Sequence, residues 1–183
     1  MLENQVGKRY AEALSGSISD DGALEKALEN LKSFYKAMSL EPELARFFEH
    51  PSISVDKKEN VVREISTRLG VEESVVRMMT LLNKRGKVLF LGKIVEYFEY
   101  VVDRRLNRTR VQVTSAHPLT SGNIDRLKAA LNKILEKTIL IDTEVDESLI
   151  GGIMLRIGDQ VADDTIRNRL EILKRTIEKE EVA

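Results

Sequence analysis

Acidic side chains gather at two places in the C-terminal third of the chain. Such clusters can hold a divalent cation or act as acid and base, because carboxylate oxygens are the ligands that Mg²⁺ and Ca²⁺ prefer. The first cluster consists of Asp142, Glu144, Asp146 and Glu147, and the second of Asp163 and Asp164. Both also have a structural explanation: the first alternates with apolar residues like the solvated face of a strand, and the second precedes a helical pattern. The structural explanation is favoured, and a small metal-dependent enzyme remains an alternative.

The rest of the chain offers little catalytic chemistry. Its two histidines, His50 and His117, are far apart in sequence, so no zinc-protease spacing is present. Gly151-Gly152 and Gly158 lie at expected strand positions, without the lysine or the helix start that a phosphate-binding loop needs. The absence of cysteine excludes disulfides, thiolate metal sites and a cysteine nucleophile. We therefore predict no catalytic residue, no metal site and no cofactor, and a surface or capping role for each histidine.

The composition carries no signature of nucleic-acid or membrane binding. Hydrophobic residues make up 42% of the 183 residues, charged residues 32%, and the formal net charge is -1. Four arginines between Arg104 and Arg110 could form a basic patch, but the end of a helix or a solvated linker explains them better. No apolar run approaches the ~20 residues of a membrane span, and the N-terminus lacks a secretory signal. We expect a soluble, cytoplasmic, bacterial chain.

Apolar residues recur at helical spacing through the first 105 residues and predict six helices. The expected helices cover residues 3–17, the stretch from the Ser19–Gly22 turn to just before Glu41, residues 42–49, 54–69, 72–85 and about 89–106. In the first of them Gly7, Ala11 and Ser15 form a stripe of small side chains. Such a stripe allows another helix to come close. Packing inside the bundle and a groove for a partner helix explain it equally well.

The helix over residues 72–85 has almost no polar face in its middle. Its apolar residues are Val75, Val76, Met78, Met79, Leu81 and Leu82. A helix that is apolar nearly all round must be surrounded, either by its own bundle or by a partner.

The hydrophobic period changes from about 3.6 to 2 after residues 106–109. Val111–Ser115 and Ile139–Val145 read as strands that flank a helix capped by Thr120, which predicts a parallel pair with a right-handed crossover. Ile153–Ile157 and Gln160–Ala162 read as a hairpin turned at Gly158-Asp159, with Asp163 or Asp164 capping a last helix. That helix carries one apolar stripe, Ile166, Leu170, Leu173 and Ile177. The fold class is mainly α with a small α+β part: a six-helix bundle over residues 1–105, then a small mixed β-sheet domain with helices over 106–183.

The run G-G-I-M-L-R-I-G-D-Q-V-A-D-D-T-I-R-N-R-L resembles the C-terminal signature of the delta subunit of bacterial F-type ATP synthase, the family of the oligomycin-sensitivity-conferring protein. The R-Y-A-E-A-L core of the first helix resembles that family as well. The chain departs from the family pattern at Ala162, at Asp164-Thr165 and at Asn168, and none of these changes removes the turn or the cap. After the fifth helix Arg85-Gly86-Lys87-Val88 keeps the family's glycine but not its asparagine.

The resemblance implies a non-catalytic stator subunit that joins the catalytic head of the enzyme to its peripheral stalk. The bundle would bind the N-terminal helix of an alpha subunit between its first and fifth helices, through Gly7, Tyr10, Ala11, Leu14, Val76, Met79 and Asn83. The second domain would bind the b subunits of the stalk through Ile166, Leu170, Leu173 and Ile177. One copy per complex, at the cytoplasmic face of the bacterial plasma membrane, is implied too.

Without the resemblance, the helical pattern indicates only a protein that binds other proteins. An unrelated helical adaptor is therefore the main alternative, and the metal-dependent enzyme is a weaker one.

Overall fold

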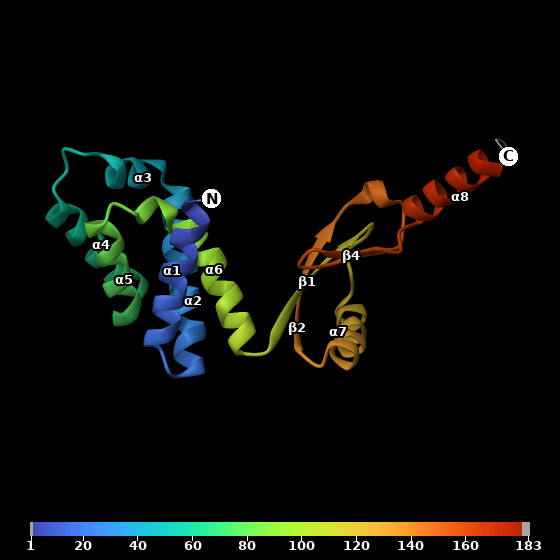
Figure 1. The fold of residues 1–183 in the computed structure, drawn as a ribbon, viewed down its shortest axis with the longest axis horizontal. Helices are drawn as coiled ribbons and strands as arrows, with labels where there is room; N and C mark the ends of the chain where they lie inside the picture. Colours follow the sequence, from blue (N-terminus) through green and yellow to red (C-terminus); the bar gives the residue numbers. More distant parts are fainter. Residues whose placement is uncertain (1, 181–183) are drawn as a thin grey trace. The chain divides into compact units, whose positions relative to one another are not determined.

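The computed structural model describes residues 2–180, which divide into two compact units, one up to Leu106 and one from Asn107 onward. The first unit contains α1 (Leu2–Ser17), α2 (Asp21–Leu40), α3 (Pro42–Glu49), α4 (Val55–Leu69), α5 (Glu73–Lys84) and α6 (Leu91–Arg105), with a 3-10 turn at Val88–Phe90 before α6 (Figure 1).

Local signals explain where several of these helices begin and end. The Asp20 carboxylate accepts a hydrogen bond from the Ala23 amide at 2.7 Å and so caps α2. Pro42 occupies the first turn of α3, where its missing amide hydrogen is not needed. Gly70 ends α4 in the left-handed conformation at φ +62°.

The core of the first unit is built around α2, which lies beside α1 and α6 (Figure 1). Apolar side chains from five of the helices meet there with no solvent exposure: Ala11, Leu24, Leu31, Phe34, Val62, Met79, Leu82, Ile94 and Phe98. This single cluster holds the six helices together as one bundle.

α1 packs mainly against α6, and the approach is unusually close at Gly7. A Cβ atom at this position would lie 2.8 Å from the carbonyl oxygen of Lys93 and 3.0 Å from the ring of Tyr97. Ala11 and Ser15, one and two turns further on, are buried as well. The stripe of small residues is therefore the packing face of α1, and close packing inside the bundle is the explanation that the structure bears out.

We expect Gly7→Ala to destabilise the bundle, by about 1–3 kcal/mol in the free energy of unfolding, because the new methyl group meets backbone that cannot move aside. Gly16→Ala in the same helix is the matched control, since nothing lies within 4 Å of its Cβ position. It should leave stability unchanged or raise it by up to about 1 kcal/mol. Chemical denaturation measures both, and equal effects of the two substitutions would contradict the close contact.

Arg105, near the end of α6, binds the C-terminal end of α1. Its guanidinium donates to the carbonyl oxygens of Ser15 at 3.4 Å, Ile18 at 2.7 Å and Ser19, and pairs with Asp21 at 3.0 Å. A cation at this position satisfies carbonyls that the helix leaves without partners. The expectation of a solvated arginine linker is thus wrong for Arg105.

Arg105→Met should lower the stability of the chain by about 1–2 kcal/mol, because the carbonyls at the end of α1 lose a charged donor. Arg104→Met is the control: it removes the same charge from the same turn of α6 at an exposed position. Thermal unfolding distinguishes the two. A general charge effect would shift both midpoints alike, whereas the capping role shifts only that of Arg105→Met.

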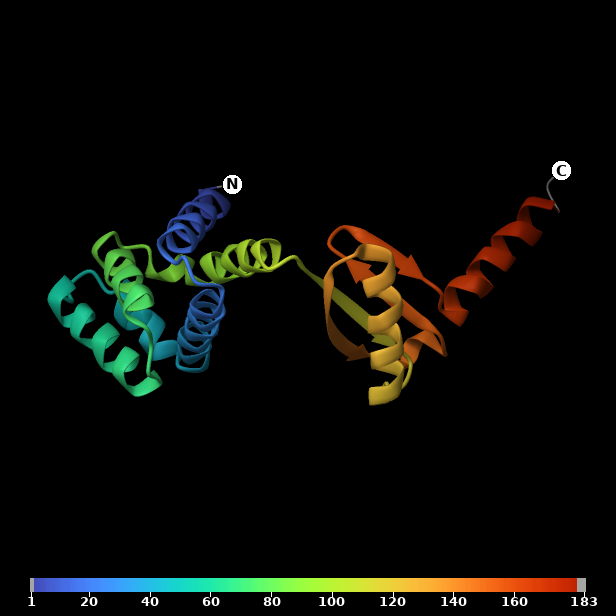
Figure 2. The ribbon, with the colours of Figure 1, turned by 90° about the horizontal axis from the view of Figure 1, so that it is seen from below.

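The second unit contains β1 (Arg108–Ser115), α7 (Ser121–Leu135), β2 (Thr138–Val145), a 3-10 turn (Glu147–Leu149), β3 (Ile153–Ile157), β4 (Gln160–Asp163) and α8 (Ile166–Glu180). The sheet has the order β2-β1-β3-β4, with β1 and β2 parallel and the other neighbours antiparallel. α7 lies along one face of the sheet (Figure 2), where Leu131 is buried with Val111, Val113 and Ile139. The fold class is confirmed: mainly helical, with a small mixed sheet.

Two element boundaries differ from the sequence prediction. β1 begins at Arg108 and not at Val111, because the parallel strand β2 offers backbone partners from Thr138 onward. Arg108 and Arg110 therefore belong to a strand. α6 begins at Leu91, after the 3-10 turn, and not near Leu89.

Candidate partner-binding surfaces

Most of the residues expected to contact a partner on the bundle are used by the bundle itself. Five of the seven are buried: Gly7, Ala11, Leu14, Met79 and Asn83. The expected groove lined by these five residues is therefore corrected, because other helices of the same unit already cover them. Only Tyr10 and Val76 keep part of their surface, and both are half-buried.

The free face of α1 is the one next to its packing face. Val6 and Tyr10 are half-buried there, and Ala13 is exposed. Their spacing places them on one side of the helix. Sequence analysis could not tell this apolar face from the small-residue face, because either could be turned toward the core.

On α5, the exposed apolar residue is Leu81, which is 45% exposed. Asn83, by contrast, donates from its side-chain amide to the carbonyl oxygen of Val55 at 3.0 Å, so its face of α5 looks toward the start of α4. Val76 lies seven residues earlier and shares that face. Leu81 is thus the residue that the site prediction missed, and its position in an almost wholly apolar helix concealed it.

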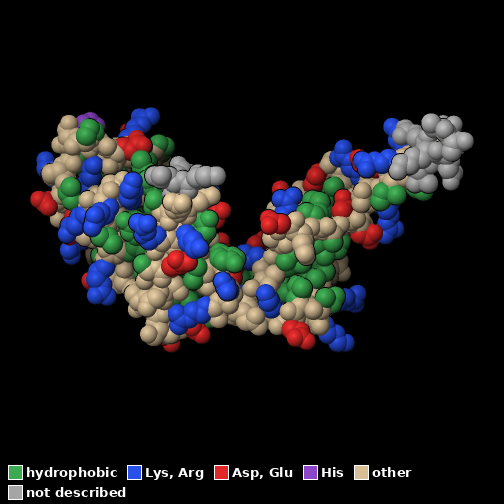
Figure 3. Space-filling view, viewed as in Figure 1, with side chains coloured by type: hydrophobic (Ala, Val, Ile, Leu, Met, Phe, Trp, Pro, Cys, Tyr) green, Lys and Arg blue, Asp and Glu red, His purple; other side chains and the backbone are tan. Residues whose placement is uncertain are grey.

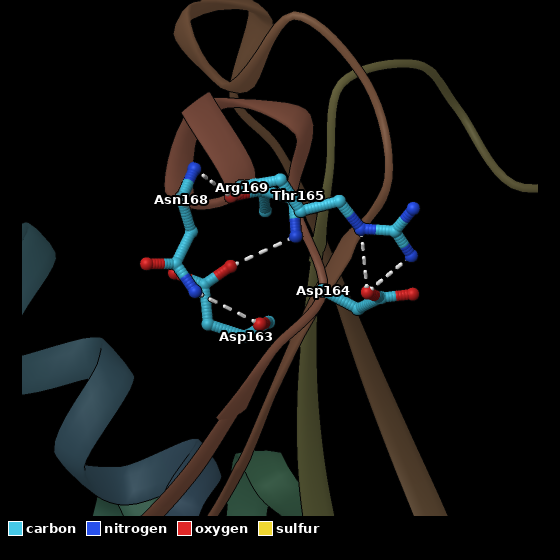
Figure 4. Close-up of polar contacts among 5 residues, drawn as sticks. All are labelled: Asp163, Asp164, Thr165, Asn168 and Arg169. Atoms are coloured by element: carbon cyan, nitrogen blue, oxygen red, sulfur yellow. Dashed lines mark hydrogen bonds and ion pairs between the residues drawn. The ribbon is translucent and has the colours of Figure 1, made fainter. Parts of the chain in front are cut away.

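The start of α8 is fixed by a set of polar contacts that Figure 4 shows in detail. The Thr165 hydroxyl accepts from the Asn168 amide at 3.2 Å, and the Asp163 carboxylate accepts from the Thr165 amide at 2.9 Å. The Asp164 carboxylate accepts from the Arg169 guanidinium at 3.0 and 2.5 Å. The capping residue is therefore Thr165 and not Asp163 or Asp164, because Asp163 still pairs with Met154 in the sheet.

The apolar stripe of α8 is left open to solvent. Four residues predicted from the sequence form it, each 44–58% exposed: Ile166, Leu170, Leu173 and Ile177. Hydrophobic and basic side chains both reach the surface of this helix (Figure 3). An amphipathic helix with an uncovered apolar face indicates a surface for a partner helix.

Gly151 and Gly152 hold the loop before β3 against the first residues of α8. The Ile166 amide donates to the carbonyl oxygen of Gly151 at 3.0 Å. A Cβ atom on Gly152, which has φ +84°, would overlap the Asp164 carbonyl oxygen and lie 2.8 Å from the Cα atom of Thr165. The two small residues therefore position α8 and bind no phosphate.

Gly152→Ala should destabilise the second unit by more than about 2 kcal/mol, since it combines left-handed strain with overlap against backbone. Gly158→Ala is the control that separates the two effects. Gly158 also has positive φ, at +57°, but nothing lies within 4 Å of its Cβ position. The control should cost only about 1–2 kcal/mol. Denaturation curves that coincide for the two variants would show that the contact with α8 contributes nothing.

The acidic clusters are engaged in local contacts. Asp142 pairs with Arg110 at 3.7 Å, and Glu144 accepts from the Gln112 amide at 2.9 Å. Hydrogen bonds from Ser148, aided by the charge of Arg167, hold the pKa of the Asp146 carboxyl below its usual value. Among residues 2–180 no group of three or more His, Asp or Glu is placed to hold a metal ion.

The two histidines are exposed and lie in turns. His50 accepts a hydrogen bond from the Ser52 amide through Nδ1 at 3.3 Å, and the backbone carbonyl of His117 accepts from the Ser115 hydroxyl at 2.7 Å.

A hollow of about 380 Å³ lies between the end of α5 and the loop from α3 to α4. Its lining includes Lys58, whose ammonium group donates to the carbonyl oxygens of Phe48 and His50 at 2.8 and 2.9 Å. The basic group is thus bound to the backbone of the chain. Within the described residues, none of the helices is long and apolar enough to cross a membrane.

Comparison with known proteins identifies relatives over nearly the whole chain. Residues 6–177 match the family model described as ATP synthase delta (OSCP) subunit. The ATP synthase subunits delta of Anaeromyxobacter sp. (strain Fw109-5) and Geotalea uraniireducens (strain Rf4) are each 30% identical over 179 residues, covering 98% of this chain and 100% and 99% of theirs. That of Myxococcus xanthus is 29% identical over 181 residues.

The fold has a counterpart among solved structures. A chain in the cryo-EM structure of the Toxoplasma gondii mitochondrial ATP synthase hexamer superimposes with a TM-score of 0.71 at 22% identity, over 97% of each chain. Sequence and fold agree over both units, and the chain therefore belongs to the ATP synthase delta (OSCP) subunit family.

Proposed function

We propose that this chain holds the catalytic head of an F-type ATP synthase to its peripheral stalk through two separate helical surfaces, one on each unit. As a delta subunit it is a non-catalytic part of the stator, so its task is to resist the torque of the rotating shaft. Such a task requires contacts that outlast each catalytic step. Buried apolar contacts between helices meet this requirement better than exposed ion pairs, which contribute at most about 1 kcal/mol each.

The observation that carries the proposal is the open apolar stripe of α8. Ile166, Leu170, Leu173 and Ile177 recur at steps of four, three and four residues, as in a helix that packs lengthwise against another helix. Among the described residues of the second unit, no element covers the stripe. We assign to it the helical segment at the C-terminal end of the b subunits.

For the N-terminal helix of an alpha subunit we propose the free faces of α1 and α5. Val6, Tyr10 and Ala13 offer apolar surface on α1, and Leu81 offers it on α5. Of the residues expected from the sequence, Tyr10 and Val76 remain candidates. One copy per complex, at the cytoplasmic face of the bacterial plasma membrane, completes the proposal.

Two binding measurements on the full chain test both surfaces. Leu170→Ser with Leu173→Ser should weaken capture of a peptide from the C-terminal end of the b protein about tenfold or more, because two exposed anchors are lost. Leu81→Ser should weaken binding of a peptide from the N-terminal end of the alpha protein to a similar extent. Each variant should leave the other peptide's affinity unchanged, since the two peptides are assigned to different units.

Matched controls remove apolar surface elsewhere. Ile134→Ser on α7 and Leu40→Ser at the end of α2 replace residues that are 76% and 68% exposed, and neither should alter either affinity in isothermal titration calorimetry. A wild-type chain that binds neither peptide would refute the stator proposal and would favour an unrelated adaptor.

A further inference from the structure

Ile150 has an unfavourable backbone conformation and an exposed side chain. It lies in the loop before β3 with φ +68°, in the left-handed region that β-branched residues rarely adopt. Its side chain is nevertheless 61% exposed, so no core contact of this unit explains why an isoleucine stands there. Strained backbone that carries an exposed apolar side chain is typical of a functional surface.

The loop that carries Ile150 lies against the first turn of α8. Its neighbour Gly151 accepts the Ile166 amide at 3.0 Å, and a Cβ atom on Gly151 would lie 2.7 Å from the Cδ1 atom of Ile166. The Arg167 guanidinium donates to the Ser148 hydroxyl at 3.3 Å. Ile150 is therefore next to the N-terminal end of the apolar stripe of α8.

Basic residues border the stripe. Arg167 and Lys174 are seven residues apart and lie along one side of it, and Arg169 lies along the other. α8 as a whole contains five basic and three acidic residues. In a pair of helices packed side by side, residues that border the apolar seam face the bordering residues of the partner, and opposite charges are favoured there.

We propose that Ile150 and the stripe of α8 form one continuous surface, and that its occupant is an amphipathic helix with acidic residues along its apolar seam. The proposal rests on the assignment of α8 to the b subunits and names the chemistry of the segment that binds. Ile150 contacts the end of the partner helix, the stripe contacts its apolar face, and Arg167 and Lys174 face its carboxylates.

The first test is Ile150→Asn in the full chain, titrated with the same peptide from the C-terminal end of the b protein. Asparagine tolerates the left-handed conformation, so the unfolding midpoint should stay the same or rise. The dissociation constant should increase about fivefold or more, because an apolar anchor is lost. Ile134→Asn, on α7, is the control and should leave the affinity unchanged.

The second test is a charge exchange. Arg167→Glu with Lys174→Glu should weaken peptide binding about tenfold at low salt and less at high salt, since exposed charges are screened. Replacing the acidic seam residues of the peptide by lysine should restore binding to this variant and weaken binding to the wild type.

The outcomes separate this inference from the function on which it rests. If the wild-type chain does not bind the peptide of the b protein, the assignment of α8 fails. If it binds, but Ile150→Asn binds equally well, Ile150 is not part of the surface while the assignment stands. Binding that is independent of salt and indifferent to the charge exchange overturns the acidic partner. A lower unfolding midpoint for Ile150→Asn would show that Ile150 supports the fold, which also contradicts the proposal.

Discussion

The close contact of α1 with α6 at Gly7 determines what the bundle can offer to a partner. Because a backbone carbonyl, that of Lys93, occupies the place of a side chain there, only the small-residue face of α1 can turn inward. Val6, Tyr10 and Ala13 are left on the free side. Arg105 holds the far end of the same helix through three carbonyl oxygens, so α1 is fixed along its length before any partner arrives.

The second unit solves a similar problem with different means. A helix of 15 residues is marginally stable alone in water, and most of its stability must come from packing of its apolar face. α8 lacks that packing within the described part of its own unit, but its first turn is anchored by Thr165, by the Gly151 carbonyl and by the Arg169–Asp164 pair. Partner binding and helix stability are therefore coupled: the partner supplies the packing, and the anchored first turn reduces the entropy lost on docking.

How far the sequence predicts this structure depends on the distance over which each signal acts. Local signals were sufficient for the helix limits at Asp20, Pro42 and Gly70, for the alternation in β3 and for the stripe of α8. Signals that depend on distant partners failed. Asn83 is buried because it binds Val55, 28 residues away, and Arg105 reaches carbonyls nearly 90 residues earlier. The choice between two apolar faces of α1 likewise depends on α6, so the buried and free residues of that helix were exchanged.

The same contrast explains why the charges of this chain steer a partner better than they hold it. The ion pairs along its helices, such as Arg63–Glu59 at 2.9 Å and Arg68–Glu64 at 2.6 Å, join neighbouring turns and are largely exposed, so each contributes about 0.3–0.5 kcal/mol. A subunit of the stator must withstand torque in every catalytic cycle, and contacts of that size exchange too easily to do so. The lasting contribution has to come from apolar surface that becomes buried on assembly. In the second unit this surface lies chiefly on α8, which makes that helix the element on which the attachment of the stalk depends.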